Sequence, residues 1–358
     1  MSQRQTVLLR KSHVVPWSRH DTFENTDFIL SKDIDIDPGW PTEWAGIAVK
    51  GKLTLRNCTI RGEVETFQES WTQRPLSKYA GFYGLKATDG AVLDFEQVHF
   101  QNIPRVACWM AGSTGRLVDC SATLVGVGFH WDQSGTQPNS NFHVERMRVW
   151  DTWGYEDLPD TPPNQRWGID GGAYSLTHPH RVGGNGFGGV LQWSRFEDCE
   201  CVGETHGAKF VGAYGVTLSG GKYHHLVLQG YDRATWNPVT QRYDDSHQLA
   251  QNVQDHGARR VEVLHLTINP RLGWRGRLPA ALHMNYPNDP PGYSIRHCKI
   301  WAFEAPPHQA VQLWGPQHIQ FISNDFYRMR EETPWIKVGA GSPMIDLSVD
   351  NTLWDLMG

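Results

Sequence analysis

The sequence predicts an all-β fold, a single right-handed parallel β-helix of about ten coils with long loop insertions. A strand-turn-strand pattern recurs along the chain, glycine and proline are frequent, and four cysteines fall at the same place in their copies of the pattern. The 36 Gly and 21 Pro leave few stretches long enough for a helix. This balance favours many short strands joined by turns.

Each copy consists of a short strand, a glycine-containing turn and a second alternating strand that ends in an Asn/Asp-type turn. Early copies cover residues 46–60, 84–100, 107–120 and 128–149. Later copies begin near Gly168, Gly207, Val253, Leu282, Val311 and Ile336. The spacing is roughly 20–25 residues where no insertion intervenes, which is a solenoid period. Since one copy cannot bury its own apolar face, the copies must stack with their strands paired in parallel.

Four cysteines lie just before the second turn of their copies. These are Cys58, Cys120, Cys199 and Cys298. We interpret them as a buried thiol stack, because a disulfide between equivalent positions of neighbouring coils would need a specific geometry. No CxxC pair supports a zinc site.

Composition excludes some classes of function. A formal net charge of −5 without a basic run argues against nucleic-acid binding. No run of about 18 apolar residues predicts a membrane span. Residues 1–10 lack the apolar core of a signal peptide, which leaves a secreted mature form, a phage particle or the cytoplasm open. The 16 Trp suit stacking on sugar rings.

We expect residues 1–43 to form an N-terminal cap and the first strands, and residues 44–358 to form the β-helix. Long insertions rich in Trp, Tyr, Pro, Gly and charge interrupt the repeat at 63–80, 151–165, 173–188, 230–248 and 271–279. In a solenoid such insertions emerge as loops that wall a binding face. A groove near the middle of the β-helix is therefore the predicted site.

Two segments, residues 53–60 and 293–300, resemble the rungs of pectate-lyase-like β-helices. The resemblance covers residues 44–354. It implies a carbohydrate-active enzyme. Lyases with this fold often use Lys or Arg as the base, frequently with calcium. Hydrolases with this fold commonly use pairs of Asp.

Strand alternation predicts which side chains point away from the core at this site. The first strand of each copy should place an apolar residue inward and its successor outward. The predicted outward row is Lys86, Met110, His130, Asp170, Lys209, Gln254, His283, Gln312 and Lys337. Two residues further on, Thr88, Asp132, His256, Asn285 and Trp314 face the same way. We expect His130, Asp170 and Lys209 to be consecutive neighbours with Asp132 beside them.

This row suits β-elimination on a uronic polysaccharide. Lys209 is the predicted base, and Asp170 would orient it or bind a cation. His130 and His283 would neutralise the substrate carboxylate or protonate the leaving oxygen. The predicted substrate-binding residues are His283, Lys86, Gln254, His256, Trp314 and Asn285. Calcium stays open, because only Asp132 and Asp170 are evident ligands, and no metal site is assigned.

Two alternatives remain. A glycoside hydrolase would use Asp132 and Asp170 as its carboxylate pair, with Asp255 as a weaker third. A glycan-binding module that resembles phage tail spikes, often homotrimers, would bind without cleaving. The outward row holds more cations than carboxylates, which favours an anionic polysaccharide and a lyase.

Overall fold

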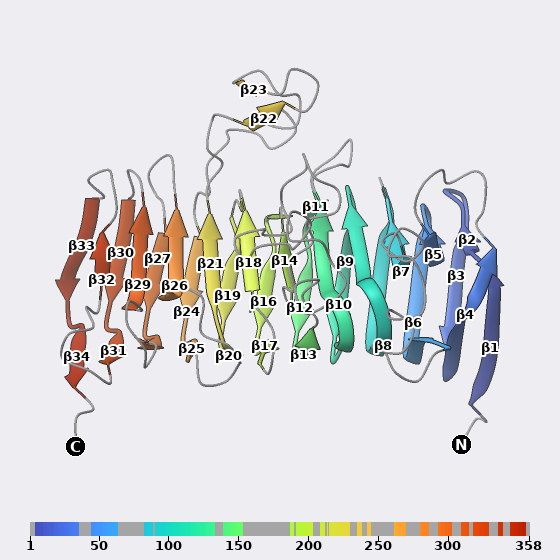
Figure 1. Ribbon diagram of the computed structural model, residues 1–358, viewed down its shortest axis with the longest axis horizontal. Helices are drawn as coiled ribbons and strands as arrows, with labels where there is room; N and C mark the ends of the chain where they lie inside the picture. The colour runs from blue at the N-terminus through green and yellow to red at the C-terminus, as the bar shows by residue number, and fades with distance from the viewer. Residues whose placement is uncertain are drawn as a thin grey trace, which may run out of the picture.

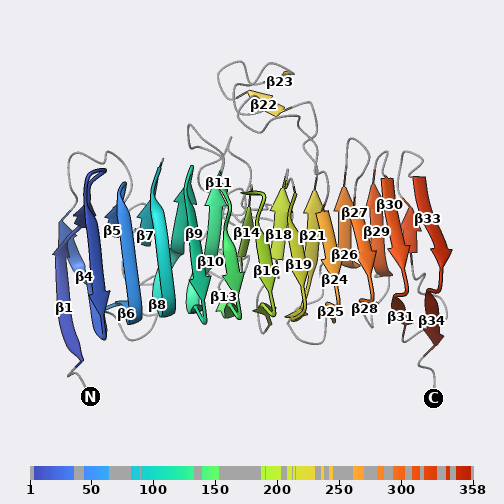
Figure 2. The ribbon, with the colours of Figure 1, turned by 180° about the vertical axis from the view of Figure 1, so that it is seen from behind.

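The computed structural model describes residues 4–35, 44–63, 82–88, 90–132, 139–152, 187–189, 191–202, 208–211, 213, 215–229, 235–237, 242–244, 261–269, 280–285, 293–302, 309–314, 318–328, 336–338 and 344–355. Its strands form a parallel β-helix, as predicted. The coils follow one another along the long axis, with the two termini at opposite ends (Figures 1 and 2). The described part of the chain holds no helix with the length and apolar character needed to cross a bilayer.

The parallel pairings fall into three ladders in the described residues. We call the first ladder sheet 1. It runs through β2 (His13–Val15), β5 (Trp44–Val49), β7 (Phe82–Ala87), the ends of β8 (Val92–Ala111) and β10 (Ser121–Asp132), β14 (Phe187–Gly189), β18 (Ala208–Val211), β21 (Leu226–Gln229), β26 (Ala280–Asn285), β29 (Gln309–Trp314) and β32 (Ile336–Val338).

Sheet 2 follows sheet 1 along each coil. It contains β3 (His20–Glu24), the first parts of β6 (Lys52–Gly62) and β8, β9 (Thr114–Val118), β12 (His143–Glu145), β16 (Arg195–Glu197), β19 (Thr217–Ser219), β24 (Val261–Leu264), β27 (Tyr293–Arg296), β30 (His318–Ile322) and β33 (Met344–Val349).

Sheet 3 completes the coil. It contains β1 (Gln5–Lys11), β4 (Thr26–Asp35), later parts of β6 and β8, the start of β10, β13 (Arg148–Thr152), β17 (Glu200–Cys201), β20 (Lys222–Tyr223), β25 (Thr267–Ile268), β28 (Lys299–Trp301), β31 (Asp325–Arg328) and β34 (Thr352–Asp355). Because β1, β2 and β3 pair in parallel with β4, β5 and β6, the stack already includes residues 5–35.

Two short pairs lie outside these ladders. The strand β11 (Asn139–Ser140) pairs in parallel with β15 (Leu191–Gln192) at a corner between sheets 1 and 2. The strands β22 (Thr235–Asn237) and β23 (Arg242–Asp244) form an antiparallel hairpin within 230–248. This hairpin stands away from the stack, at the top of Figure 1.

The core consists of apolar rows that run along the axis. On sheet 3 one inward position is held in successive coils by Phe28, Ile60, Phe100, Ala122, Val149, Cys201, Tyr223, Ile268, Ile300 and Phe326. All of these side chains are buried. In mid-helix the buried Trp131 makes edge-on contacts with Phe142 and Phe196, at ring-centroid distances of 5.5 and 5.3 Å.

The predicted Asn/Asp-type turn is the corner between sheets 2 and 3. In every described coil its residue has a positive φ: Asn25, Asn57, Gln97, Asp119, Arg146, Asp198, Gly220, His265, His297, Ser323 and Asp350. Asn, Asp and Gly adopt this left-handed conformation most readily. The recurrence of such residues in the sequence is thus a direct consequence of the coil geometry.

The four cysteines are buried and free, as predicted, but they lie just after the turn rather than just before it. Each of the four follows a positive-φ corner residue and points into the core, and all six cysteines of the chain are buried and free. Other residues separate the four thiols, however: Val98 and Met147 occupy the same position in intervening coils. The thiols are therefore members of a mixed row rather than a continuous stack.

Side chains of this mixed row donate hydrogen bonds to the backbone carbonyl groups at the corners between sheets 2 and 3. The Cys298 thiol donates to the carbonyls of Arg296 and Val263, at 3.2 and 3.6 Å. In the next coil Asn324 Nδ2 donates to the carbonyl of Ile295 at 2.9 Å. Since a left-handed corner interrupts regular strand pairing, buried carbonyls there need side-chain donors. Small polar residues recur in the row for this reason.

Candidate functional site

The candidate site is the outward row of sheet 1. Strand pairing puts Lys86 beside Trp109, and Trp109 beside His130. On the other side of His130 the row continues through Gly188 to Lys209. Adjacent strands are about 4.8 Å apart. Lys86 and Lys209 therefore lie two coils to either side of His130, on one line parallel to the axis.

Three predicted members of this row are wrong. Trp109 rather than Met110 follows Lys86, because Cys108 and Met110 are the inward residues of this strand. Gly188 rather than Asp170 lies between His130 and Lys209, because residues 187–189 supply the strand of that coil.

Val227 rather than Gln254 follows Lys209 in the row. The reason is that β21, which begins after one short coil, supplies the next strand of sheet 1. Gln229 likewise takes the place predicted for His256 in the neighbouring row, next to Asn285. Asp170, Gln254, His256 and Asp255 lie outside the described residues, so their predicted roles stay predictions.

His130 forms the polar centre of the row. Its Nε2 lies 3.1 Å from Asp132 Oδ2, and the two residues alternate with the inward Trp131 on the same strand. His130 is only 3% exposed, whereas the Asp132 side chain is 16% exposed. A carboxylate that holds an imidazole ring fixes its orientation, which is the arrangement of a general acid or base.

Asn139 fixes the end of this strand. Its Nδ2 donates to the carbonyl of Asp132 at 2.7 Å, and its Oδ1 accepts from the backbone N–H of Ser113 at 3.1 Å. Asn139 is 1% exposed, so both bonds are shielded from water. They connect Asp132 to the adjacent coil and hold the backbone that carries the carboxylate.

Lys86 lies against aromatic rings. Its Nζ is 4.6 Å from the centroid of the Trp109 ring and 5.7 Å from that of Tyr83. All three residues face away from the apolar rows, yet none is more than 9% exposed. An ammonium over an indole face is stabilised by the ring quadrupole. The arrangement positions a cation two coils from His130.

The structure describes the backbone of the remaining predicted residues. His283 follows Val227 in the same row and pairs with Gln312. Asn285 and Trp314 pair with each other in the row of Asp132. These registers agree with the sequence prediction.

Sequence reasoning missed Tyr83, Trp109 and Asn139. Tyr83 could have been found from the spacing in 83–86, where it precedes Lys86 by three residues at the start of a strand, whereas Trp109 lies in an apolar stretch without such a signal. Asn139 carries no comparable signal, because its role depends on bonds across the coil. In the described part of the chain, no three His, Cys, Asp or Glu side chains gather to hold a metal ion.

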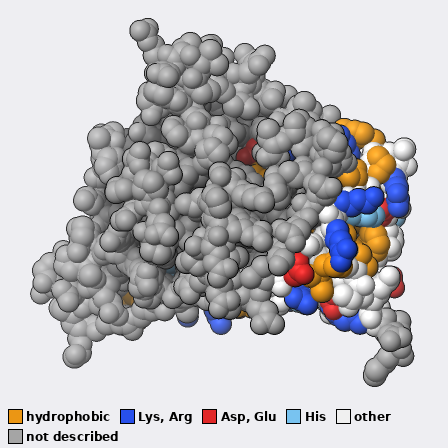
Figure 3. All heavy atoms as spheres, turned by 45° about the vertical axis from the view of Figure 1, so that its right-hand side comes forward, with side chains coloured by type: hydrophobic (Ala, Val, Ile, Leu, Met, Phe, Trp, Pro, Cys, Tyr) orange, Lys and Arg blue, Asp and Glu red, His pale blue; other side chains and the backbone are white. Residues whose placement is uncertain are grey.

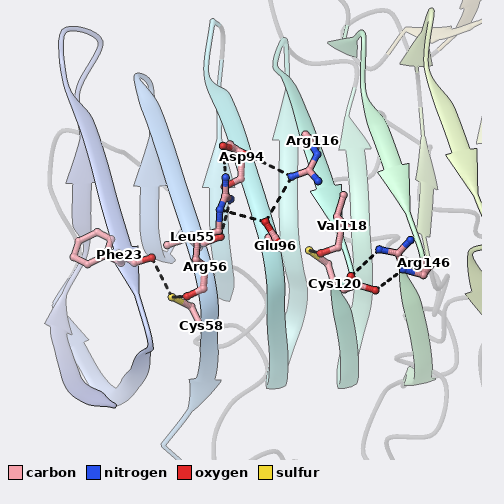
Figure 4. Close-up of polar contacts among 11 residues, drawn as sticks. Phe23, Leu55, Arg56, Cys58, Asp94, Glu96, Arg116, Val118, Cys120 and Arg146 are labelled. Carbon is pink, nitrogen blue, oxygen red and sulfur yellow. Dashed lines mark hydrogen bonds and ion pairs between the residues drawn. The ribbon is translucent and has the colours of Figure 1, made fainter. Parts of the chain in front are cut away.

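The outer face of sheet 2 differs from this site, because its basic and acidic side chains form ion pairs with one another at the surface. Arg56 contacts Asp94 at 2.6 Å, and Arg116 lies 3.8 Å from both Asp94 and Glu96 (Figure 4). Basic, acidic and apolar side chains are also interspersed on the described surface seen in Figure 3. Such exposed pairs contribute little to stability and offer no concentrated field to a ligand. We therefore assign the candidate site to sheet 1.

No protein-family model matches the chain, and no curated protein matches it. Among solved structures it is similar to an alginate lyase from Paenibacillus sp. str. FPU-7, with 9% identity and a TM-score of 0.31 over 91% of this chain and 92% of that one. It is also similar to a tailspike protein double mutant of E. coli bacteriophage HK620 in complex with pentasaccharide, with 10% identity and a TM-score of 0.33. That match covers 96% of this chain, which spans 60% of the tailspike. The fold assignment itself rests on the strand pairings above.

Proposed function

We propose that the chain cleaves an anionic polysaccharide by β-elimination at the outward row of sheet 1. One observation carries this proposal: the hydrogen-bonded His130 and Asp132 lie between two lysines of the same row, Lys86 and Lys209. Two lysines on one line along the axis suit the carboxylates of a chain of uronic acids. The acid–base pair at its centre suits proton transfer.

In the proposed reaction a base removes the proton on the carbon next to the uronate carboxylate. The electron pair forms a carbon–carbon double bond, the bond to the glycosidic oxygen breaks, and an acid protonates that oxygen. His130 is the best-placed proton carrier, because Asp132 orients its ring. Lys86 and Lys209 would neutralise substrate carboxylates and so stabilise the enolate-like intermediate.

Lys209 is the alternative base, as expected from the sequence. Its position two coils from His130 would let one residue remove the proton and the other deliver it to the leaving oxygen. This division of roles needs Lys209 in its neutral form when it removes the proton. Loss of the rate with Lys209→Met, at unchanged substrate affinity, would support it.

Hydrolysis is the second candidate, favoured by the partly exposed carboxylate of Asp132. A hydrolase needs a second carboxylate across the scissile bond, and Asp170 is the sequence candidate for it. Binding without cleavage would use the same cationic row.

A screen of alginate, pectate, glycosaminoglycans and bacterial capsules separates the three. Elimination leaves a conjugated double bond, so ultraviolet absorbance and reducing ends must rise together. Reducing ends without the absorbance would mean hydrolysis. Binding without either signal would mean a glycan-binding module.

A further inference from the structure

Trp193 has a backbone conformation that is unusual for its size. It lies at the corner between sheets 1 and 2, with φ of 48°. The residues in register with it in the two adjacent coils are Asn141 and Gly215, with φ of 55° and 63°. Asn and Gly tolerate this conformation, whereas a bulky side chain there is strained. Strained residues of this kind gather at ligand sites.

The corner presents the indole to solvent instead of burying it. Trp193 is 50% exposed, although large apolar side chains are normally covered. One side of the ring lies on Gly215, where an added Cβ would be only 2.5 Å from Cε3 of Trp193. The glycine thus leaves room for the ring to lie close against the backbone. A flat, supported and exposed aromatic is suited to packing against the apolar face of a sugar ring.

The coil of Trp193 is also the central coil of the candidate site. Its strand β14 contributes Gly188, which lies between His130 and Lys209 in the outward row. Trp193 follows Gly188 by five residues, at most about 16 Å of extended chain. A glycan bound at His130 that extends along the strand direction, across sheet 1 towards its corner with sheet 2, would therefore reach the indole within a few sugar units.

We propose that Trp193 is a sugar-stacking residue at the edge of the polysaccharide site, contacting units remote from the cleaved bond. This inference rests on the function proposed above. It predicts that long oligosaccharides gain affinity from the indole and that short ones, which do not reach the corner, gain none.

Trp17 provides a matched control. It is 61% exposed and its ring also lies on a glycine, since an added Cβ at Gly90 would be 2.4 Å from Cζ3 of Trp17. Trp17 belongs to the turn between β2 and β3, several coils from His130, and is not among the described residues with positive φ. A general effect of losing an exposed Trp would show equally at both positions.

The decisive variant is Trp193→Asn, because Asn fits the left-handed corner. With a stacking role, the dissociation constant for a long substrate oligosaccharide rises about tenfold while the melting temperature stays level or increases. Trp193→Phe keeps most of the affinity, and Trp17→Asn keeps all of it. Unchanged affinity of Trp193→Asn, measured by titration calorimetry, overturns the inference.

Further variants keep the test decisive. If Trp193→Asn fails to fold, Trp193→Leu and Trp193→Phe are compared: equal affinity of the two overturns the inference, and loss with Leu alone supports it. If the unmodified chain binds no glycan of the panel, the proposed function and the inference fall together. If His130→Gln still cleaves while Trp193→Asn binds weakly, only the proposed chemistry fails.

Discussion

Asp132 accepts a hydrogen bond from His130, with 3.1 Å between Oδ2 and Nε2, and both residues lie on one side of the strand β10. Because the bond orients the imidazole, Asp132→Asn should lower kcat while the melting temperature changes little. His130→Gln should lower kcat about 10²–10⁴-fold, the usual contribution of a positioned acid or base. Steady-state rates on the substrate found in the panel would measure both. Full activity of Asp132→Asn would exclude an orienting role.

Lys86 should contribute to binding rather than to the chemical step. Lys86→Met keeps an apolar stem beside Trp109 but removes the cation, so KM for an anionic substrate should rise about tenfold with kcat unchanged. The rise should shrink as salt is added, since screening weakens the lost attraction. A KM that is equally sensitive to salt in both proteins would contradict this. Lys52→Met, an exposed lysine on sheet 2, is the control.

The buried thiols should make the fold sensitive to alkali. Burial raises the pKa of Cys120, Cys199 and Cys298 from 9.0 to about 12. Their stabilising contribution is complete below about pH 9 and is lost as pH rises towards 12, because the unfolded chain releases these protons first. The melting temperature should therefore fall between about pH 9 and pH 12, and less so in a variant with all three changed to Ala. Equal falls would contradict the assignment.

The same thiols should be inert in the folded state. Only the thiolate is nucleophilic, and burial disfavours it. A thiol reagent at pH 8 should modify none of the six cysteines until a denaturant unfolds the chain. Rapid labelling of the native protein would show that the core row opens.

Asn324 should be more important for stability than its position in a turn suggests. Its side chain accepts from the backbone N–H of Cys298 and donates to the carbonyl of Ile295, both at 2.9 Å, and it is 1% exposed. Asn324→Ala leaves both groups buried without this partner and should cost about 3 kcal/mol. Gln320→Ala, on the exposed face of the preceding strand, is the control and should change the melting temperature little.

Much of this fold could be predicted from the sequence, because each coil repeats the same physical requirements. Left-handed corners favour Asn, Asp or Gly, and a buried inward residue follows most of them, which makes Cys58 and Cys298 comparable across the chain. The register at Lys86, His130 and Lys209 followed from alternation alone.

The sequence prediction of the outward row was wrong where the alternation of apolar and polar residues does not distinguish inward from outward positions. In Cys108-Trp109-Met110 every residue is apolar, so a slip by one residue looks the same in the sequence. Two segments, 168–170 and 186–188, both offer a glycine followed by an apolar residue, and the strand uses the second. The sequence did not predict the short coil between β18 and β21. Only two residues separate the end of β20 from the start of β21, so no turn of the usual length marks the boundary between the coils.

We propose that sheet 1 carries out elimination on an anionic glycan through His130. The most direct measurement compares the unmodified chain with His130→Gln on the substrate found in the panel, following ultraviolet absorbance and reducing ends at matched melting temperatures. If His130 transfers the proton, both signals rise together with the unmodified chain and nearly vanish with the variant. Equal rates for the two proteins, or reducing ends without absorbance, would contradict it.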